Sequence, residues 1–126
     1  SVKLKYLNEE IKRRHCIAKL YLDEIQNPRI TLPLTIGGQE SHVWHLFVVK
    51  CESRDKLNKY LLDNDIQPLI HYPIPPHKQL AYKDVFNRAY PVSEAIHEKV
   101  LSLPIDPTMS DSDVLKIIEV VNKYDL

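Results

Sequence analysis

The residues best suited to chemistry lie in one short stretch, which reads Gln-Pro-Leu-Ile-His-Tyr-Pro-Ile-Pro-Pro-His over residues 67–77. Each proline in it fixes its own backbone angle φ and pushes the preceding residue towards extended geometry. We therefore predict a stiff "proline arm" (residues 67–77) that carries His71, Tyr72 and His77. Imidazole and phenol groups can donate hydrogen bonds, which suits a polar ligand that bears a sugar or a phosphate. The alternative is a proline-rich connection without a binding role.

Other chemistries find less support in the residue spacing. His42 and His45 lie three apart on a predicted strand, so they point to opposite faces and cannot bind one metal ion. No Cys-x-x-Cys or His-x-x-x-His pair occurs, and we predict no metal site. Cys16 and Cys51 have no paired spacing, which favours reduced thiols in a cytoplasmic protein. The only glycines are Gly37 and Gly38, so a glycine-rich phosphate loop is excluded.

The composition is that of one globular domain of 126 residues. Lys and Arg together number 17, as do Asp and Glu, so the formal net charge is zero. This balance gives no attraction to nucleic acid or to an anionic membrane surface. No apolar run approaches the roughly 20 residues that a membrane-spanning helix needs. We predict neither kind of partner.

Hydrophobic periodicity predicts the elements that position the proline arm. Helices are expected over residues 2–26 and 53–63, from Pro91 with Val92, Ala95, Ile96 and Val100 on its buried side, and after a capping box at 110–113. Strands are expected over 43–49, 66–72 and 101–105. The fold class is therefore α+β, with a small antiparallel or mixed three-stranded sheet and helices packed on one of its faces. In this single domain, a long leading helix (1–27) precedes an α+β core (28–126).

Two features are typical of a piece of a larger protein. The first helix begins without a capping residue. The predicted strand 43–49 is apolar on both faces, so the face that the helices leave open needs a partner.

Several segments together carry a family resemblance. They are His42–Lys50, Arg54–Leu57, Ile70–His77 and Leu101–Pro104, with Arg14 and Tyr21 on the first helix. This set resembles the C-terminal small domain of the DegT/DnrJ/StrS sugar-nucleotide aminotransferases over essentially the whole chain. The His-Tyr-Pro-x-Pro-x-His segment is its most specific part.

The resemblance implies an enzyme of fold type I that depends on pyridoxal 5'-phosphate (PLP). Such enzymes transfer an amino group, usually from glutamate, to a keto sugar linked to a nucleoside diphosphate. The form of the proline arm is most similar to that of members that act on a dTDP-linked 3-keto-6-deoxyhexose. The products serve the synthesis of deoxyaminosugars or of surface polysaccharides such as lipopolysaccharide. The resemblance also implies a homodimer, and substrate-binding roles for His71, Tyr72, His77 and, more weakly, Gln79.

The chain departs from the family pattern in one large respect. It has no segment that corresponds to the large N-terminal domain, and none of its lysines stands in the context of the family's Schiff-base lysine. We therefore expect PLP to be bound mainly by that missing domain, no catalytic residue in this chain, and an inactive fragment. The alternative to an enzyme domain is a free-standing interaction or regulatory module without catalysis.

Overall fold

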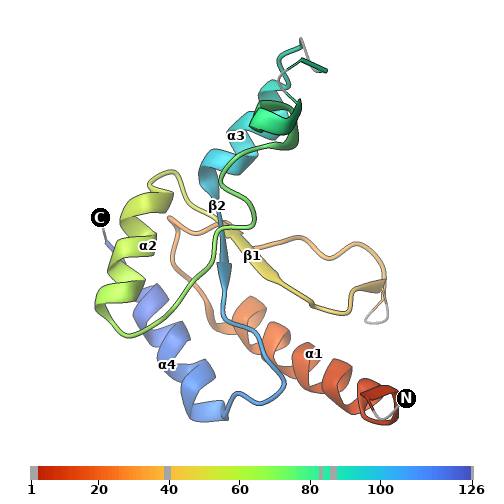
Figure 1. The fold of residues 1–126 in the computed structure, drawn as a ribbon. Helices are drawn as coiled ribbons and strands as arrows, with labels where there is room; N and C mark the ends of the chain where they lie inside the picture. The colour runs from red at the N-terminus through yellow and green to blue at the C-terminus, as the bar shows by residue number, and fades with distance from the viewer. Residues whose placement is uncertain (1–2, 39–40, 83, 86–87, 126) are drawn as a thin grey trace.

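The structure is a computed structural model that describes residues 3–38, 41–82, 84–85 and 88–125 (Figure 1). Four α-helices occur in these residues: α1 (Leu7–Glu24), α2 (Arg54–Asp63), α3 (Pro91–Lys99) and α4 (Asp111–Asn122). Two strands, β1 (Phe47–Lys50) and β2 (Val100–Leu103), lie between them, and short 3₁₀ turns are formed by η1 (Lys3–Lys5), η3 (Pro76–Lys78) and η4 (Leu80–Tyr82). None of these helices is long and apolar enough to cross a membrane.

The sheet is small and antiparallel, which confirms the predicted α+β class. β1 pairs with β2 so that Phe47 lies opposite Leu103 and Lys50 opposite Val100. Each side of this pair is extended by one isolated bridge, from Thr31 to Lys50 and from Leu69 to Ser102. In the described residues the sheet therefore has two strands and two bridges, rather than the three strands that the sequence predicts.

The predicted strands at 43–49 and 66–72 are too long, for two different physical reasons. Trp44 has a φ of 51°, in the left-handed region, which ends extended structure there. Its ring instead stacks on Phe47 in the core, with the ring centroids 5.4 Å apart. In the second segment, Pro68 and Pro73 have no N–H to give to a strand ladder, so only Leu69 between them pairs.

The core lies between the sheet and the helices α1, α2 and α4 (Figure 1). All four residues predicted to face inward from the last helix are buried: Val114, Ile117, Ile118 and Val121. The predicted capping box is also present, because the Ser110 hydroxyl accepts from the Asp113 N–H and the Asp113 carboxylate accepts from the Ser110 N–H. This cap fixes the start of α4 and so the direction in which its apolar side enters the core.

Helix α1 contributes to the core only in its second half. Ile17, Ala18 and Tyr21 are fully buried, whereas Leu4 and Leu7 near its start are 67% and 43% exposed. The helix was predicted from residue 2, but it begins at Leu7, because Lys3–Lys5 form the 3₁₀ turn η1. Its start has no side-chain cap, as the sequence predicts. The apolar stripe of the sequence is therefore continuous, but its first part stays largely exposed in the described residues.

Helix α3 departs from the predicted packing on one face of the sheet. It projects from the body of the molecule and runs directly into β2 (Figure 1). Four residues were predicted to form its buried side, and the prediction is wrong for Val92, Ala95 and Ile96, which are exposed. Of the four, only Val100 is buried, and it is the first residue of β2. The helix is amphipathic in sequence, but no other described element covers its apolar side.

Candidate functional site

The base of the proline arm is fixed to β2 by Ser102. The backbone N–H of Leu69 donates to the Ser102 carbonyl at 3.1 Å, and the Ser102 N–H donates to the Leu69 carbonyl at 2.8 Å. Two residues further on, the His71 ring nitrogen Nδ1 lies 2.9 Å from the Ser102 hydroxyl. Ser102 is only 4% exposed, and His71 is half-buried. The position of the His71 ring is thus set by a residue in the sheet.

Tyr72 is directed outward from the same place. It is 66% exposed, and its ring stands edge-on to the His71 ring with centroids 5.6 Å apart. The two side chains therefore form one small unit beside the outer edge of β2, with Tyr72 facing outward. The Tyr72 phenol and the free edge of the His71 imidazole can both hydrogen-bond to a polar ligand there.

His77, by contrast, is engaged inside the chain. Its Nε2 lies 3.0 Å from the Oε1 of Glu94 on α3, and its ring packs against Tyr90 with centroids 4.8 Å apart. Only 9% of the His77 side chain is exposed. Gln79 also bonds locally, because its Nε2 donates to the Ile74 carbonyl at 3.4 Å. Within the described residues, the four predicted binding residues thus do not converge on one cavity.

Glu94 is the centre of the contact between the proline arm and α3. Besides His77, it accepts from Lys78 Nζ at 2.5 Å and from the backbone N–H of Tyr90 at 3.0 Å. The hydrogen bond from Lys78, followed by those from Tyr90 and His77, lowers the pKa of Glu94 to about 2. A carboxylate in the first turn of a helix is also favoured by the helix dipole. Glu94 was not predicted from the sequence, although an acidic residue in the first turn of a helix that starts at Pro91 is a usable signal.

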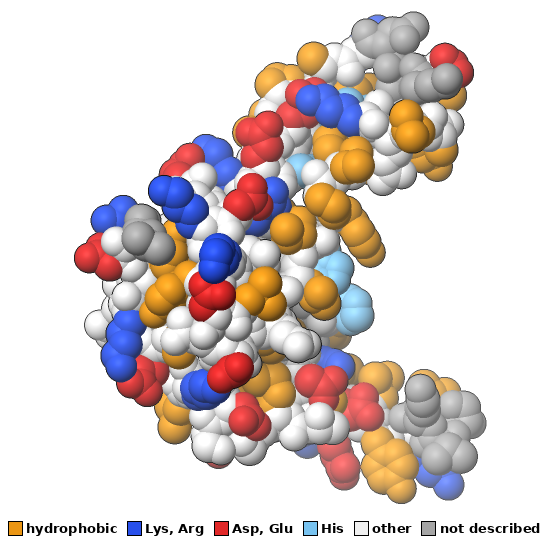
Figure 2. Space-filling view, turned by 60° about the vertical axis from the view of Figure 1, so that its left-hand side comes forward, with side chains coloured by type: hydrophobic (Ala, Val, Ile, Leu, Met, Phe, Trp, Pro, Cys, Tyr) orange, Lys and Arg blue, Asp and Glu red, His pale blue; other side chains and the backbone are white. Residues whose placement is uncertain are grey.

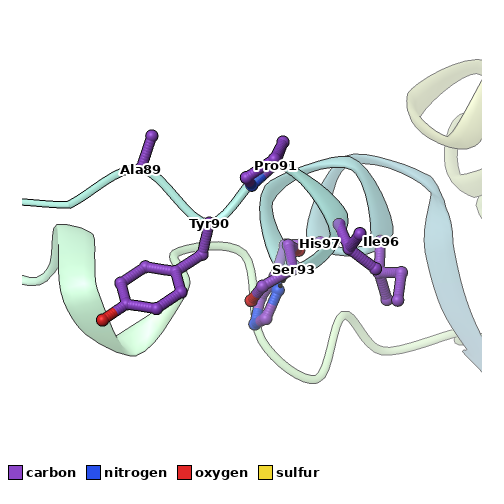
Figure 3. A pocket seen from close by; sticks show the side chains of 7 residues that line it. Ala89, Tyr90, Pro91, Ser93, Ile96 and His97 are labelled. Carbon is purple, nitrogen blue, oxygen red and sulfur yellow. Dashed lines mark hydrogen bonds between the residues drawn. The ribbon is translucent and has the colours of Figure 1, made fainter.

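Two hollows lie beside this contact. The larger, about 550 Å³, is the apolar groove of α3, lined by Ala89, Tyr90, Pro91, Val92, Ser93, Ile96 and His97. Its side chains come from α3 and the residues just before it, with Tyr90 extending away from the helix (Figure 3). The smaller, about 200 Å³, lies between the prolines of the arm and Glu94, His97 and Glu98. Neither is lined by His71 or Tyr72.

The surface around α3 is correspondingly apolar. Val92 is 74% exposed and Ile96 44% exposed. In the space-filling view, the segment that carries α3 stands out from the body of the molecule, with hydrophobic side chains over its surface (Figure 2). Such an exposed apolar surface is typical of a face that packs against another domain or chain.

Comparison with known proteins shows the family. The chain matches the DegT/DnrJ/EryC1/StrS aminotransferase family over residues 1–122, and it belongs to that family. The resemblance found in the sequence is thereby confirmed.

Among the relatives, the dTDP-3-amino-3,6-dideoxy-alpha-D-galactopyranose transaminase of Aneurinibacillus thermoaerophilus is 50% identical over 98% of this chain. A dTDP-3-amino-3,4,6-trideoxy-alpha-D-glucose transaminase of Streptomyces venezuelae is 35% identical, also over 98%. The crystal structure of S. venezuelae DesV matches the fold with a TM-score of 0.90 over 97% of the chain, at 35% identity. The chain spans only about a third of these relatives, namely 34%, 33% and 33% of their lengths.

Proposed function

We propose that this chain is the C-terminal small domain of a PLP-dependent aminotransferase that acts on a nucleotide sugar. The complete protein would transfer the amino group of glutamate to a keto sugar linked to a nucleoside diphosphate. The observation that carries this proposal is the match, at half of the aligned positions, to a protein named as a dTDP-3-amino-sugar transaminase. It favours a dTDP-linked 3-keto-6-deoxyhexose as substrate, a role in deoxyaminosugar or surface polysaccharide synthesis, and a homodimer in the cytoplasm.

The described residues do not themselves fit a PLP site. When bound, PLP supplies the electron sink for the exchange of amino groups. The lysine that holds it needs a low pKa, usually through burial. In this chain, the hydrogen bond from Lys19 to Asp23 raises the pKa of Lys19. The hydrogen bond from Lys123 to Glu119 likewise raises the pKa of Lys123. Lys78 donates its hydrogen bond to Glu94. We therefore propose that the cofactor is bound mainly by a domain outside these residues.

Within that enzyme, we assign the binding of the sugar nucleotide to the outward-facing pair His71 and Tyr72. Both lie beside the outer edge of β2, where a second domain would close over their hydrogen-bonding groups. His77 and Gln79, which the family resemblance also places at the substrate, would act there by holding the proline arm in shape. Their hydrogen bonds within the chain support this division.

The deciding experiment uses the complete protein with added PLP. Glutamate is expected to convert the bound PLP to pyridoxamine phosphate, seen by absorbance, and a dTDP-3-keto-6-deoxyhexose is expected to reverse the change and yield an aminated sugar by mass spectrometry. Conversion by glutamate without reversal would reject this sugar class. A folded, complete protein that binds no PLP would reject the enzyme and favour an interaction module, with the apolar groove of α3 as its contact surface.

The substitution Tyr72→Phe tests the assigned binding pair in the same assay. Removal of the phenolic donor is expected to raise the KM for the keto sugar, while the conversion by glutamate stays unchanged. Equal losses in both half-reactions would show that Tyr72 does not act at the sugar.

A further inference from the structure

We infer that Ser102 is a positioning residue: its buried hydroxyl orients the His71 ring so that Nε2–H points at an oxygen of the nucleotide-sugar substrate. The inference rests on the proposed function, because it takes His71 to contact that substrate. Ser102 itself never meets the ligand, since it is 4% exposed and lies within β2.

The backbone N–H and carbonyl of Ser102 already have hydrogen-bond partners, so its hydroxyl is the polar group that still needs one. Its N–H and carbonyl are both used by Leu69, which fixes the register of the proline arm against β2. Its neighbours in the strand, Leu101 and Leu103, are buried and apolar. A buried hydroxyl without a partner is costly, and the partner that the structure gives it is His71 Nδ1, at 2.9 Å.

This pairing selects the tautomer of the His71 ring. A serine hydroxyl must place its single proton on an acceptor, and Nδ1 of a neutral imidazole accepts only when the ring proton is on Nε2. We therefore assign the Ser102 O–H as donor and Nδ1 as acceptor. Nε2, which makes no hydrogen bond within the described residues, then carries the proton and becomes a donor.

The resulting donor fits the chemistry of the ligand. A nucleoside-diphosphate sugar offers phosphate, hydroxyl and carbonyl oxygens, all of which accept hydrogen bonds. Tyr72, with its ring 5.6 Å from that of His71, adds a phenolic donor beside it. Ser102, fixed in the sheet, thereby sets the direction of a donor that lies at the end of a loop.

The test compares Ser102→Ala and Ser102→Thr in the complete protein with PLP. Loss of the hydroxyl is expected to raise the KM for the keto sugar about fivefold, the effect of one ordinary hydrogen bond, and to leave the reaction with glutamate unchanged. Ser102→Thr, which keeps the hydroxyl, is expected to restore the KM. Ser53→Ala is the control, since the Ser53 side chain makes no capping hydrogen bond at the start of α2.

A double-mutant cycle separates positioning from simple packing. In a His71→Gln background, Ser102→Ala is expected to have no further effect on the sugar KM, because Ser102 acts through the ring that is gone. An equal rise in both backgrounds, or no rise in either, would overturn the inference.

The tautomer gives a readout that does not depend on turnover. Nitrogen-15 NMR of histidine-labelled complete protein is expected to show His71 protonated at Nε2, assigned by loss of the signal in His71→Gln, and a mixture of tautomers in Ser102→Ala. A ring protonated at Nδ1 would overturn the inference even in an active enzyme. A protein with the expected tautomer that does not aminate the sugar would instead reject the proposed function and the ligand assigned to His71.

Discussion

At the residue scale, His71 and His77 differ in what their ring nitrogens already contact. The Nε2 of His77 contacts Glu94, and the side chain is nearly covered. Within the described part of the chain, His71 makes a hydrogen bond through Nδ1 alone, to Ser102. The residue type is the same, so the sequence assigns both to binding. Their hydrogen-bond partners differ, so His71 keeps a ring edge facing outward. His77 instead connects the proline arm to α3 through Glu94.

Glu94→Gln tests the fastening role of the Glu94 contact. The folded-state pKa of Glu94 is lowered from 4.5 to about 2, so its charge stabilises the fold above pH 4.5. That stabilisation is lost as the pH falls from 4.5 towards 2. In urea unfolding of the purified chain, we expect the substitution to lower the free energy of unfolding at pH 7. The difference in this free energy between variant and wild type should shrink as the pH falls through this acid range. A gap that is independent of pH would show that the charge of Glu94 is not responsible.

At the element scale, the two N-caps of α2 and α4 form a natural comparison. Ser110 makes a complete capping box at the start of α4, whereas Ser53 precedes α2 without a side-chain bond. Ser110→Ala is expected to cost about 1 kcal/mol of unfolding free energy, and Ser53→Ala close to none. Urea denaturation of both variants measures the difference. Equal costs would mean that the box adds nothing to the stability of α4.

The position of α3 outside the core is tested by a matched pair of isoleucines. Ile117 on α4 is 5% exposed and Ile96 on α3 is 44% exposed. Ile117→Ala is expected to cost about 2–5 kcal/mol, since it leaves a cavity in the core. Ile96→Ala is expected to change stability by less than about 0.5 kcal/mol, as surface substitutions do. If Ile96→Ala strongly lowered the free energy of unfolding of the purified chain, α3 would have to pack against the rest of the molecule.

At the scale of the whole molecule, the described residues form a packed core and leave some apolar faces exposed. The core joins α1, α2, α4 and the sheet, whereas α3 and the start of α1 leave apolar side chains exposed. The chain spans about a third of its relatives (34% and 33%). In the enzyme proposed above, the large domain would pack against these exposed faces.

The purified chain by itself is expected not to bind PLP. The lysine side chains that the structure describes, which leave out Lys3, are paired or exposed. The pKa of Lys19 and of Lys123 is raised, which disfavours the neutral amine that would bond to the cofactor aldehyde. We expect the absorbance of PLP to be the same with and without the chain, and unchanged by glutamate. A stable, stoichiometric shift of the absorbance, lost on heating, would contradict the assignment of the cofactor to another domain.

The sequence by itself determined the helices, the cap of α4 and the family. Helical hydrogen bonds are local, so a stripe such as Val114, Ile117, Ile118 and Val121 and a cap at Ser110 can be found without knowing the rest of the fold. The His-Tyr-Pro-x-Pro-x-His segment likewise pointed to the family from its residues alone.

Only the tertiary structure decided the extent of the strands, the exposure of α3 and the contacts of the arm residues. A strand exists only where its partner lies, and the turn at Trp44 and the prolines around Leu69 limit that pairing. Ser102 and His71 are 31 residues apart, and His77 and Glu94 are 17 apart. No local pattern contains such contacts, because they arise when β2 and α3 meet the proline arm in space.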